Sequence, residues 1–326
     1  MSTVYFFPPA PKGGYPNPYC VHFKQALSRY FRVLDNENKE CAVAAWGLFR
    51  HSFCADVYVL NWVENIAFHR LGWLQYAVAM FALFIIAIRR KKIVWVLHNI
   101  TPHQGHDFYT KTLYRFLFKR ARLVIAHSKE AERFADLHAK GRVVYECHPI
   151  IPIEAKPVDT DHCDLLIWGT IDPYKGVEEF ISSKVVRDSK LSIMIAGRCK
   201  DRELDHRINS MTNEHIRFQN RRVSFEEIAG LVKNSRYVVF PYIGASISSS
   251  GVLIDTLAFG GTPIGPHRGA FRDLADEGVC LIYKDFNHLV ELVRKNAMLE
   301  EDSRKAFLKN HSWEEFASHI HLLLES

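Results

Sequence analysis

Short apolar segments typical of β-strands recur along the whole chain, and segments with helical periodicity separate them. The strand candidates are 4–7, 56–60, 93–98, 123–127 and 143–147, followed by 164–168, 191–196, 216–219, 237–240, 263–265 and 279–283. Nearly continuous apolar strands are typical of parallel sheets that are covered on both faces, and the intervening helices supply the crossovers. The alternation therefore predicts an α/β protein with two Rossmann-like, doubly wound domains.

The boundary between the two domains is expected near residues 148–162, a stretch with three prolines and mixed polar residues. A chain of 326 residues suits two domains of roughly 150 residues each. We place the N-terminal domain at 1–152 and the C-terminal domain at 160–311. Ligands of doubly wound domains bind at the carboxyl ends of the strands, so a cleft between the two domains is the expected site.

Charge divides unevenly between the halves. Residues 1–150 carry 20 Lys and Arg against 10 Asp and Glu, whereas residues 151–326 carry 22 against 26. A basic N-terminal half suggests an anionic partner such as a lipid surface, a lipid phosphate or nucleic acid. Nucleic acid is disfavoured because the basic residues match no recognised module. Seven scattered cysteines and an N-terminus unlike a signal peptide predict a cytoplasmic protein with reduced thiols.

Residues 71–88 form an uncharged apolar stretch that borders on a transmembrane helix. Buried strands are predicted on both sides of it, and two strands of one βαβ unit lie on the same side of a membrane. We therefore favour a core or interfacial helix over a membrane span. A second helix, at 111–122, places Lys111, Arg115, Lys119 and Arg122 on one face, which suits either an anionic lipid surface or plain solvation.

The run YVVFPYIGASISSSGVLIDTLAFGGTPIG (237–265) predicts a strand, a small-residue loop and a helix that begins near Ser250. The N-terminus of such a helix offers free backbone N–H groups to a phosphate, and Asp255, one turn further on, is placed to accept hydrogen bonds from a ribose. An ordinary loop with a solvated Asp255 is the alternative. In WGTIDPYKGVEEF (168–180), Gly169 ends a strand and Lys175 precedes a helix, so Lys175 is placed to meet a diphosphate.

These motifs resemble bacterial sugar-nucleotide glycosyltransferases of family 4, which have the GT-B fold of two Rossmann-like domains facing across a cleft. The similar stretches are GTIDPYKGVEEF, RRVSFEEIAGLVKNSRYVVFPY, SSSGVLIDTLAFGGTPIG, VWVLHNITPH, LVIAHSKEA, the early Asn-Pro-Tyr at 17–19 and the closing HSWEEFA. The resemblance covers nearly the whole chain. It implies a hexosyltransferase-type enzyme in which the helix at 312–326 packs back on the N-terminal domain.

The resemblance also implies a role for individual residues. The residues implied to bind a UDP- or GDP-sugar donor are Gly169, Thr170, Lys175, Arg198, Arg222, Val223, Ser249, Ser250, Gly251, Val252 and Asp255. Asn17, Tyr19, His98 and Asn99 are implied to lie on the acceptor side, and His98, Lys175 and Asp255 to be catalytic. The implied acceptor is a glycan, carried on a polyprenyl diphosphate or otherwise, for cell-surface polysaccharide synthesis at the inner face of the membrane. Retention of the anomeric configuration is implied as well.

Two positions depart from the family pattern. Ile247 replaces the first Glu of a Glu-x7-Glu pair, and Thr170 replaces a frequent Arg, which shifts the positive charge onto Lys175, with Arg198 as a second source. No metal or other cofactor is expected, because the sequence has no Asp-x-Asp motif after a strand and His103 and His106 lie in a Pro/Gly loop. A sugar-nucleotide epimerase on the same fold and a non-catalytic nucleotide-binding subunit remain the alternatives.

Overall fold

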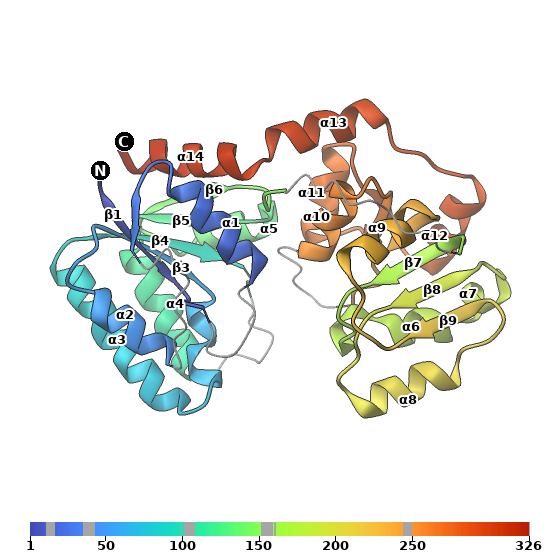
Figure 1. Ribbon diagram of the computed structural model, residues 1–326, viewed down its shortest axis with the longest axis horizontal. Helices are drawn as coiled ribbons and strands as arrows, with labels where there is room; N and C mark the ends of the chain where they lie inside the picture. Colours follow the sequence, from blue (N-terminus) through green and yellow to red (C-terminus); the bar gives the residue numbers. More distant parts are fainter. Residues whose placement is uncertain are drawn as a thin grey trace. The chain divides into compact units, whose positions relative to one another are not determined.

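The computed structural model describes residues 1–10, 17–34, 43–98, 100, 108–150, 159, 161–243 and 250–325. The chain divides into two compact units (Figure 1), one made of Met1–Cys147 with Trp313–Ser326 and the other of His148–Ser312. Each unit contains one six-stranded sheet in which all neighbouring strands run parallel. The predicted pair of doubly wound α/β sheets is confirmed.

The first unit orders its strands β2-β1-β3-β4-β5-β6. The strands are β1 (Thr3–Phe7), β2 (Arg32–Leu34), β3 (Val57–Asn61), β4 (Lys92–Leu97), β5 (Leu123–Ala126) and β6 (Arg142–Tyr145). The helices are α1 (Pro18–Leu27), α2 (Ala44–His51), the 3-10 helix η1 (Val63–Phe68), α3 (Gly72–Ile88), α4 (Phe108–Arg120), α5 (Lys129–Asp136) and α14 (Trp313–Glu325). The direction of winding reverses between β1 and β3, so the connections after these two strands lead in opposite directions along the sheet.

Alternating side chains along β1 assign the helices to the two faces of this sheet. Tyr5 and Phe7 join a core cluster that α2, α3, α4 and α5 complete. Phe6 faces the other way, where its ring lies 5.2 Å from that of Phe23 in α1, and Phe23 lies 5.0 Å from Phe316 in α14. Helices α2–α5 therefore cover one face while α1 and α14 cover the other; Figure 1 shows α14 on the opposite side from α2, α3 and α4.

The second unit orders its strands β12-β11-β10-β7-β8-β9. The strands are β7 (Cys163–Trp168), β8 (Ile193–Ala196), β9 (Ile216–Gln219), β10 (Ser235–Val239), β11 (Pro263–Pro266) and β12 (Leu281–Tyr283). The helices are η2 (Pro173–Lys175), α6 (Val177–Ser182), α7 (Lys184–Asp188), α8 (Arg202–Ser210), α9 (Phe225–Lys233), α10 (Gly251–Ala258), α11 (Gly269–Asp276), α12 (Phe286–Arg294) and α13 (Glu301–Asn310). Strands β7 and β10 are neighbours at the point where the winding reverses, and the loops that follow them diverge there.

Every strand predicted from the sequence forms, whereas β2 was missed. Strand β2 has three residues, lies at the edge of its sheet and leaves Arg32 exposed, so it has no buried apolar run to reveal it. The last helix, α14, contacts α1 in the first unit.

Helix α3 is the apolar segment that resembled a membrane span. It has 17 residues, and the strands on either side of it, β3 and β4, are parallel neighbours in one sheet, as the sequence pattern predicted. Across the described part of the chain, no helix combines the length and apolarity needed to cross a bilayer. The inner side of α3 buries small and branched residues against the sheet, including Ala79, Ala82, Leu83 and Ile86.

Candidate functional site

The loop after β7 is held against the segment that follows β10. Gly169 follows β7 at φ +95° and Gly176 is the N-cap of α6 at φ +64°, and glycine is favoured at such positive φ values. A Cβ atom on Gly176 would lie 2.2 Å from the carbonyl oxygen of Pro241. The backbone N–H of Ile243 donates to the carbonyl of Tyr174 at 3.0 Å. These contacts set the position of the residue between them, Lys175.

Lys175 carries a buried ammonium group. Its side chain is 4% exposed, and its Nζ lies 5.7 Å from the centre of the Tyr242 ring. Nζ also lies 3.4 Å from the point where a Cβ of Gly169 would be. Burial lowers the pKa of Lys175 to about 8, against the opposite effect of the Asp172 carboxylate. A buried ammonium group gains stability from a bound anion.

The N-terminus of α10 reaches the same place. Ser250 is the N-cap of this helix, and its Oγ accepts the N–H of Leu253 at 3.4 Å and lies 3.2 Å from the Tyr242 hydroxyl. A Cβ on Gly169 would lie 2.8 Å from Cγ2 of Val252, and a Cβ on Gly251 would meet no described atom within 4 Å. The first turn of α10 therefore lies beside the Lys175 loop, and the described residues leave space at Gly251. Helix N–H groups, the helix dipole and an ammonium group are the elements from which anion sites in proteins are built, so an anion site here stays a prediction.

Asp255 lies one turn into α10 and is half-buried. Its carboxyl group has no hydrogen-bond partner among the described residues. Burial raises the pKa of Asp255 to about 7. A half-buried carboxyl without a partner is suited to accept hydrogen bonds from the hydroxyls of a ligand.

Four more of the predicted donor residues lie at the carboxyl edge of the same sheet. Thr170 and Arg198 are exposed on adjacent loops, since the N–H of Ile171 donates to the carbonyl of Arg198 at 3.0 Å. Arg222, exposed, and Val223, half-buried, follow β9 and precede α9. Ser249 and the substituted position Ile247 lie outside the described residues, as does Asn99 on the acceptor side. The binding roles of all these residues remain predictions.

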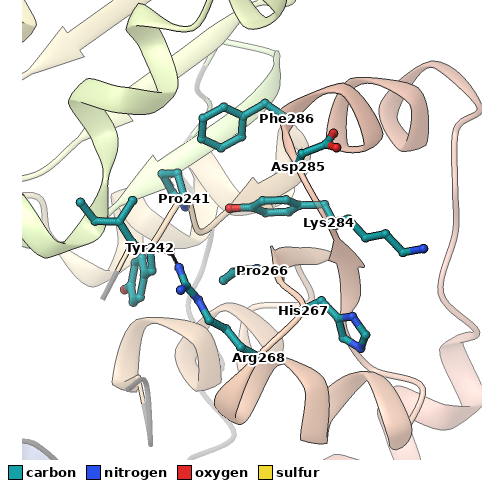
Figure 2. A pocket seen from close by; sticks show the side chains of 10 residues that line it. Pro241, Tyr242, Pro266, His267, Arg268, Lys284, Asp285 and Phe286 are labelled. Carbon is teal, nitrogen blue, oxygen red and sulfur yellow. Dashed lines mark hydrogen bonds between the residues drawn. The ribbon is translucent and has the colours of Figure 1, made fainter. Parts of the chain in front are cut away.

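Sequence reasoning missed two residues at this edge, Tyr242 and Arg268. The Tyr242 hydroxyl contacts the cap of α10 and its ring lies near Lys175, while Arg268 donates from Nη2 to the Tyr242 carbonyl at 2.6 Å (Figure 2). They line a pocket of about 400 Å³ together with Pro241, Ile243, Pro266, His267, Tyr283, Lys284, Asp285 and Phe286. Their positions in the sequence could have identified them, because Tyr242 follows β10 and Arg268 follows β11, both at the carboxyl edge of the sheet.

The first unit gathers its predicted acceptor-side residues around Tyr19. Asn17 caps α1 by accepting the N–H of Tyr19 at 3.0 Å, and the rings of Tyr19 and His98 lie 5.2 Å apart. The Tyr19 hydroxyl lies 2.9 Å from Nε2 of His127, whose Nδ1 lies 2.7 Å from the carbonyl of Glu146. His127 was not predicted as a site residue, although its position directly after β5 places it at the carboxyl edge of the sheet.

His98 follows β4, as expected, but its side chain is covered rather than exposed to a ligand. It is 4% exposed because the ring of Trp62 stacks on it at 4.0 Å, and its Nε2 lies 3.2 Å from Oδ1 of Asn61. Trp62 adopts a positive φ of 49°, which no sequence pattern indicated. A catalytic role for His98 therefore stays a prediction.

Within the described residues, no group of three or more His, Cys, Asp or Glu side chains is placed to hold a metal ion. His103 and His106 lie outside the described part of the chain.

Solved structures with the same architecture define the fold. HepE of Anabaena, solved in complex with UDP and glucose, has a TM-score of 0.64 at 14% identity, covering 98% of this chain and 95% of its own. A glycosyltransferase of Rickettsia africae has a TM-score of 0.65 at 10% identity, covering 100% and 98%. The two doubly wound units are those of the GT-B fold.

Sequence comparison points to glycosyltransferases. A GDP-mannose:glycolipid 4-beta-D-mannosyltransferase of Xanthomonas campestris pv. campestris is 26% identical over 289 residues, which are 84% of this chain and 76% of the relative. No family model matches the chain. The chain is a glycosyltransferase with the GT-B fold.

Proposed function

We propose that this protein transfers a sugar from a UDP- or GDP-sugar to a glycan acceptor. The second unit binds the nucleotide, with the diphosphate between Lys175 and the first N–H groups of α10 at Gly251 and Val252, and the ribose on Asp255. The observation that carries the proposal is the buried Lys175 ammonium beside the open N-terminus of α10. The names of the relatives agree with such a donor, since one is solved with UDP and another is named for GDP-mannose.

The reaction breaks the bond between the anomeric carbon of the donor sugar and the diphosphate oxygen. The electron pair of that bond stays on the diphosphate, whose negative charge increases, while the acceptor hydroxyl bonds to the anomeric carbon and gives its proton to water. An ammonium group and helix N–H groups already in position stabilise the departing charge without reorganising. Lys175 thus acts on the leaving group, and the buried setting strengthens its effect because little solvent competes.

The pH dependence of nucleotide binding tests the ammonium group directly. A bound diphosphate favours the charged form of Lys175, whereas the free protein loses that proton above pH 8. We expect the dissociation constant for UDP or GDP to rise about tenfold between pH 8 and 9.5. Asp255, with a pKa of about 7, is already ionised in this window, and burial keeps the pKa values of the Tyr174 and Tyr242 hydroxyls above their ordinary value.

Isothermal titration calorimetry at the two pH values measures this change. A Lys175→Met variant should bind more weakly at pH 8 and show little further loss at pH 9.5. If the wild-type affinity is constant across the window, Lys175 does not hold the diphosphate as an ammonium group.

The proposed acceptor is a lipid-linked glycan, such as one on a polyprenyl diphosphate, and the proposed role is cell-surface polysaccharide synthesis. The excess of Lys and Arg in residues 1–150 suits an anionic lipid acceptor. The Xanthomonas relative is named for a glycolipid acceptor. We place the protein at the inner face of the cell membrane in peripheral contact with anionic lipid.

A thermal-shift panel of UDP, GDP, ADP and their sugar conjugates tests donor binding, because a ligand of the native state raises its stability. We expect UDP or GDP to raise the melting temperature and ADP to do so less. The nucleotide found is then supplied as its sugar conjugate, with and without lipid-linked oligosaccharide. Transfer only with acceptor supports the proposal; isomerised donor sugar without acceptor indicates an epimerase, and binding without turnover indicates a non-catalytic subunit.

The anomeric configuration of the product is read by NMR in the same experiment. We propose retention, so an α-linked donor is expected to give an α-linked product. The Xanthomonas relative is named for a β linkage. A β-linked product from an α-linked donor would show inversion and refute this part of the proposal.

A further inference from the structure

Helix α3 exposes a continuous apolar stripe along its whole length. Leu74, Phe81, Phe84 and Ile88 are 42% to 64% exposed, and exposed Ala77 lies between the first two. Their spacing of three or four residues places them on one side of the helix, opposite the side that packs on the sheet. A soluble surface rarely keeps so long an apolar stripe in water.

Helix α2 and the turn after it widen this stripe into what we call the apolar face, made of Trp46, Phe49, Phe53 and the α3 stripe. The rings of Phe49 and Phe81 stack at 5.9 Å across the two helices, and Phe49 also lies 5.4 Å from Trp46 and 6.1 Å from Phe53. Helices α2 and α3 lie side by side on one face of the sheet (Figure 1). Trp46 and Phe53 are themselves exposed.

Positive charge predominates over negative charge among the described residues around the apolar face. Between residues 43 and 98 the acidic residues are Asp56, which pairs with Lys91 at 2.8 Å, and Glu64, which is buried. The exposed Arg50 lies on α2, and the exposed Arg89 and Arg90 follow the end of α3. The described surroundings of this face therefore favour anions.

The same layer of helices continues into a basic groove between α4 and α5, with a volume of about 590 Å³. Its base is aromatic and its rim is cationic; the lining residues are Lys111, Tyr114, Arg115, Phe118, Lys119, Phe134, His138 and Lys140. In the part of the chain that the structure describes, the four Lys and Arg side chains of the rim form no ion pair. The acidic residues of α5 are Glu130, Glu132 and Asp136, which do not line the groove.

We propose that the outer side of helices α2–α5 is the surface on which this protein docks to a bilayer containing anionic lipid. The apolar face enters the boundary between headgroups and acyl chains, and the basic groove binds the headgroup phosphates beside it. The inference extends the proposed function, on which it rests for the lipid-linked acceptor, by naming the surface and its lipid. A second copy of this surface fits it poorly, because pairing two copies brings cations together.

Sedimentation with sucrose-loaded vesicles tests the docking. We expect the protein to bind vesicles of phosphatidylcholine with phosphatidylglycerol and to bind pure phosphatidylcholine weakly. The double variant Phe84→Glu and Ile88→Glu should lower the partition coefficient at least ~10-fold. It replaces two apolar side chains that enter the bilayer in the docked protein by charged ones. The triple variant Lys111→Ala, Arg115→Ala and Lys119→Ala should lower it at least ~10-fold at low salt, and less at high salt.

Leu322→Glu is the matched control, since Leu322 is an exposed apolar residue on α14, on the other face of the same sheet. It should leave vesicle binding unchanged. Equal binding of all variants, or no preference for anionic vesicles, overturns the docking surface. A different outcome is that the wild type binds no vesicles and forms a dimer that the Phe84/Ile88 substitutions make monomeric. That result would overturn docking and show that the apolar face binds a second copy of the chain.

Nucleotide binding is measured on the same samples to keep the two proposals apart. The variants that lose vesicle binding but keep the normal fold should retain the thermal shift produced by UDP or GDP. Loss of vesicle binding with nucleotide binding intact supports docking alone. A wild-type protein that binds vesicles and no nucleotide contradicts the proposed function and leaves the docking surface standing.

Discussion

Replacing Lys175 by alanine is expected to lower the rate of donor turnover at least ~100-fold, the effect of removing one preorganised charge from a leaving group. The buried ammonium lies beside the N-terminus of α10, and in the described part of the chain no second Lys or Arg is buried near it. The measurement is kcat and KM for the nucleotide-sugar identified by the binding panel. Because the charge matters more as the diphosphate departs, kcat should fall more than affinity.

Two controls separate charge from packing. Lys175→Met keeps most of the side-chain volume without the charge, so it should fold at least as stably as the wild type and still lose turnover. Lys184→Ala removes an exposed lysine from α7 in the same unit and should change neither property. If Lys175→Ala retains near-normal turnover, the role assigned to this lysine is wrong.

Gly176→Val is expected to destabilise the second unit by about 3 kcal/mol or more, the sum of a strained left-handed backbone and an overpacked contact. Gly176 has φ +64°, and its added Cβ would lie 2.2 Å from the Pro241 carbonyl oxygen. Any relief of this clash moves the loop that carries Lys175, so nucleotide affinity should fall with stability. Urea unfolding followed by circular dichroism gives the change in midpoint.

Gly251→Ala is the matched control for this substitution. In the part of the chain that the structure describes, a Cβ on Gly251 meets nothing within 4 Å, and alanine keeps the backbone N–H proposed to bind the diphosphate. Its stability should stay within about 1 kcal/mol of the wild type, and nucleotide binding should persist. A Gly176→Val protein as stable as the wild type would show that the loop is not held as tightly as its contacts with Pro241 and Ile243 indicate.

Local pattern was sufficient for most of the fold. The strands are apolar runs bounded by turn residues, and the helices between them dictate parallel pairing, so β7 and β10 could be found from composition and period alone. The exposed edge strand β2 escaped because its pairing with β1, rather than its own sequence, makes it a strand. The positions of Lys175 and Ser250 between a strand and the helix after it were predictable for the same local reasons.

The environment of the site residues could not be predicted, because segments far apart in the sequence create it. Tyr242 comes to Lys175 from the next strand of the sheet, and Trp62 covers His98 through a backbone turn that has no sequence signature. Tyr19 and His127 lie 108 residues apart and share a 2.9 Å contact.

By itself, the sequence determined the class of architecture, two parallel sheets with small-residue loops at their carboxyl edges, because periodicity and turn chemistry act over a few residues. Only the tertiary structure decided which charged side chains are buried and which apolar side chains stay exposed to solvent. Lys175 was expected to be available to a ligand and is buried; α3, apolar all round, was expected in the core or at an interface, and it leaves one side exposed. Burial depends on what packs from elsewhere in the chain, and the pKa of Lys175 and the exposure of Phe84 follow from it.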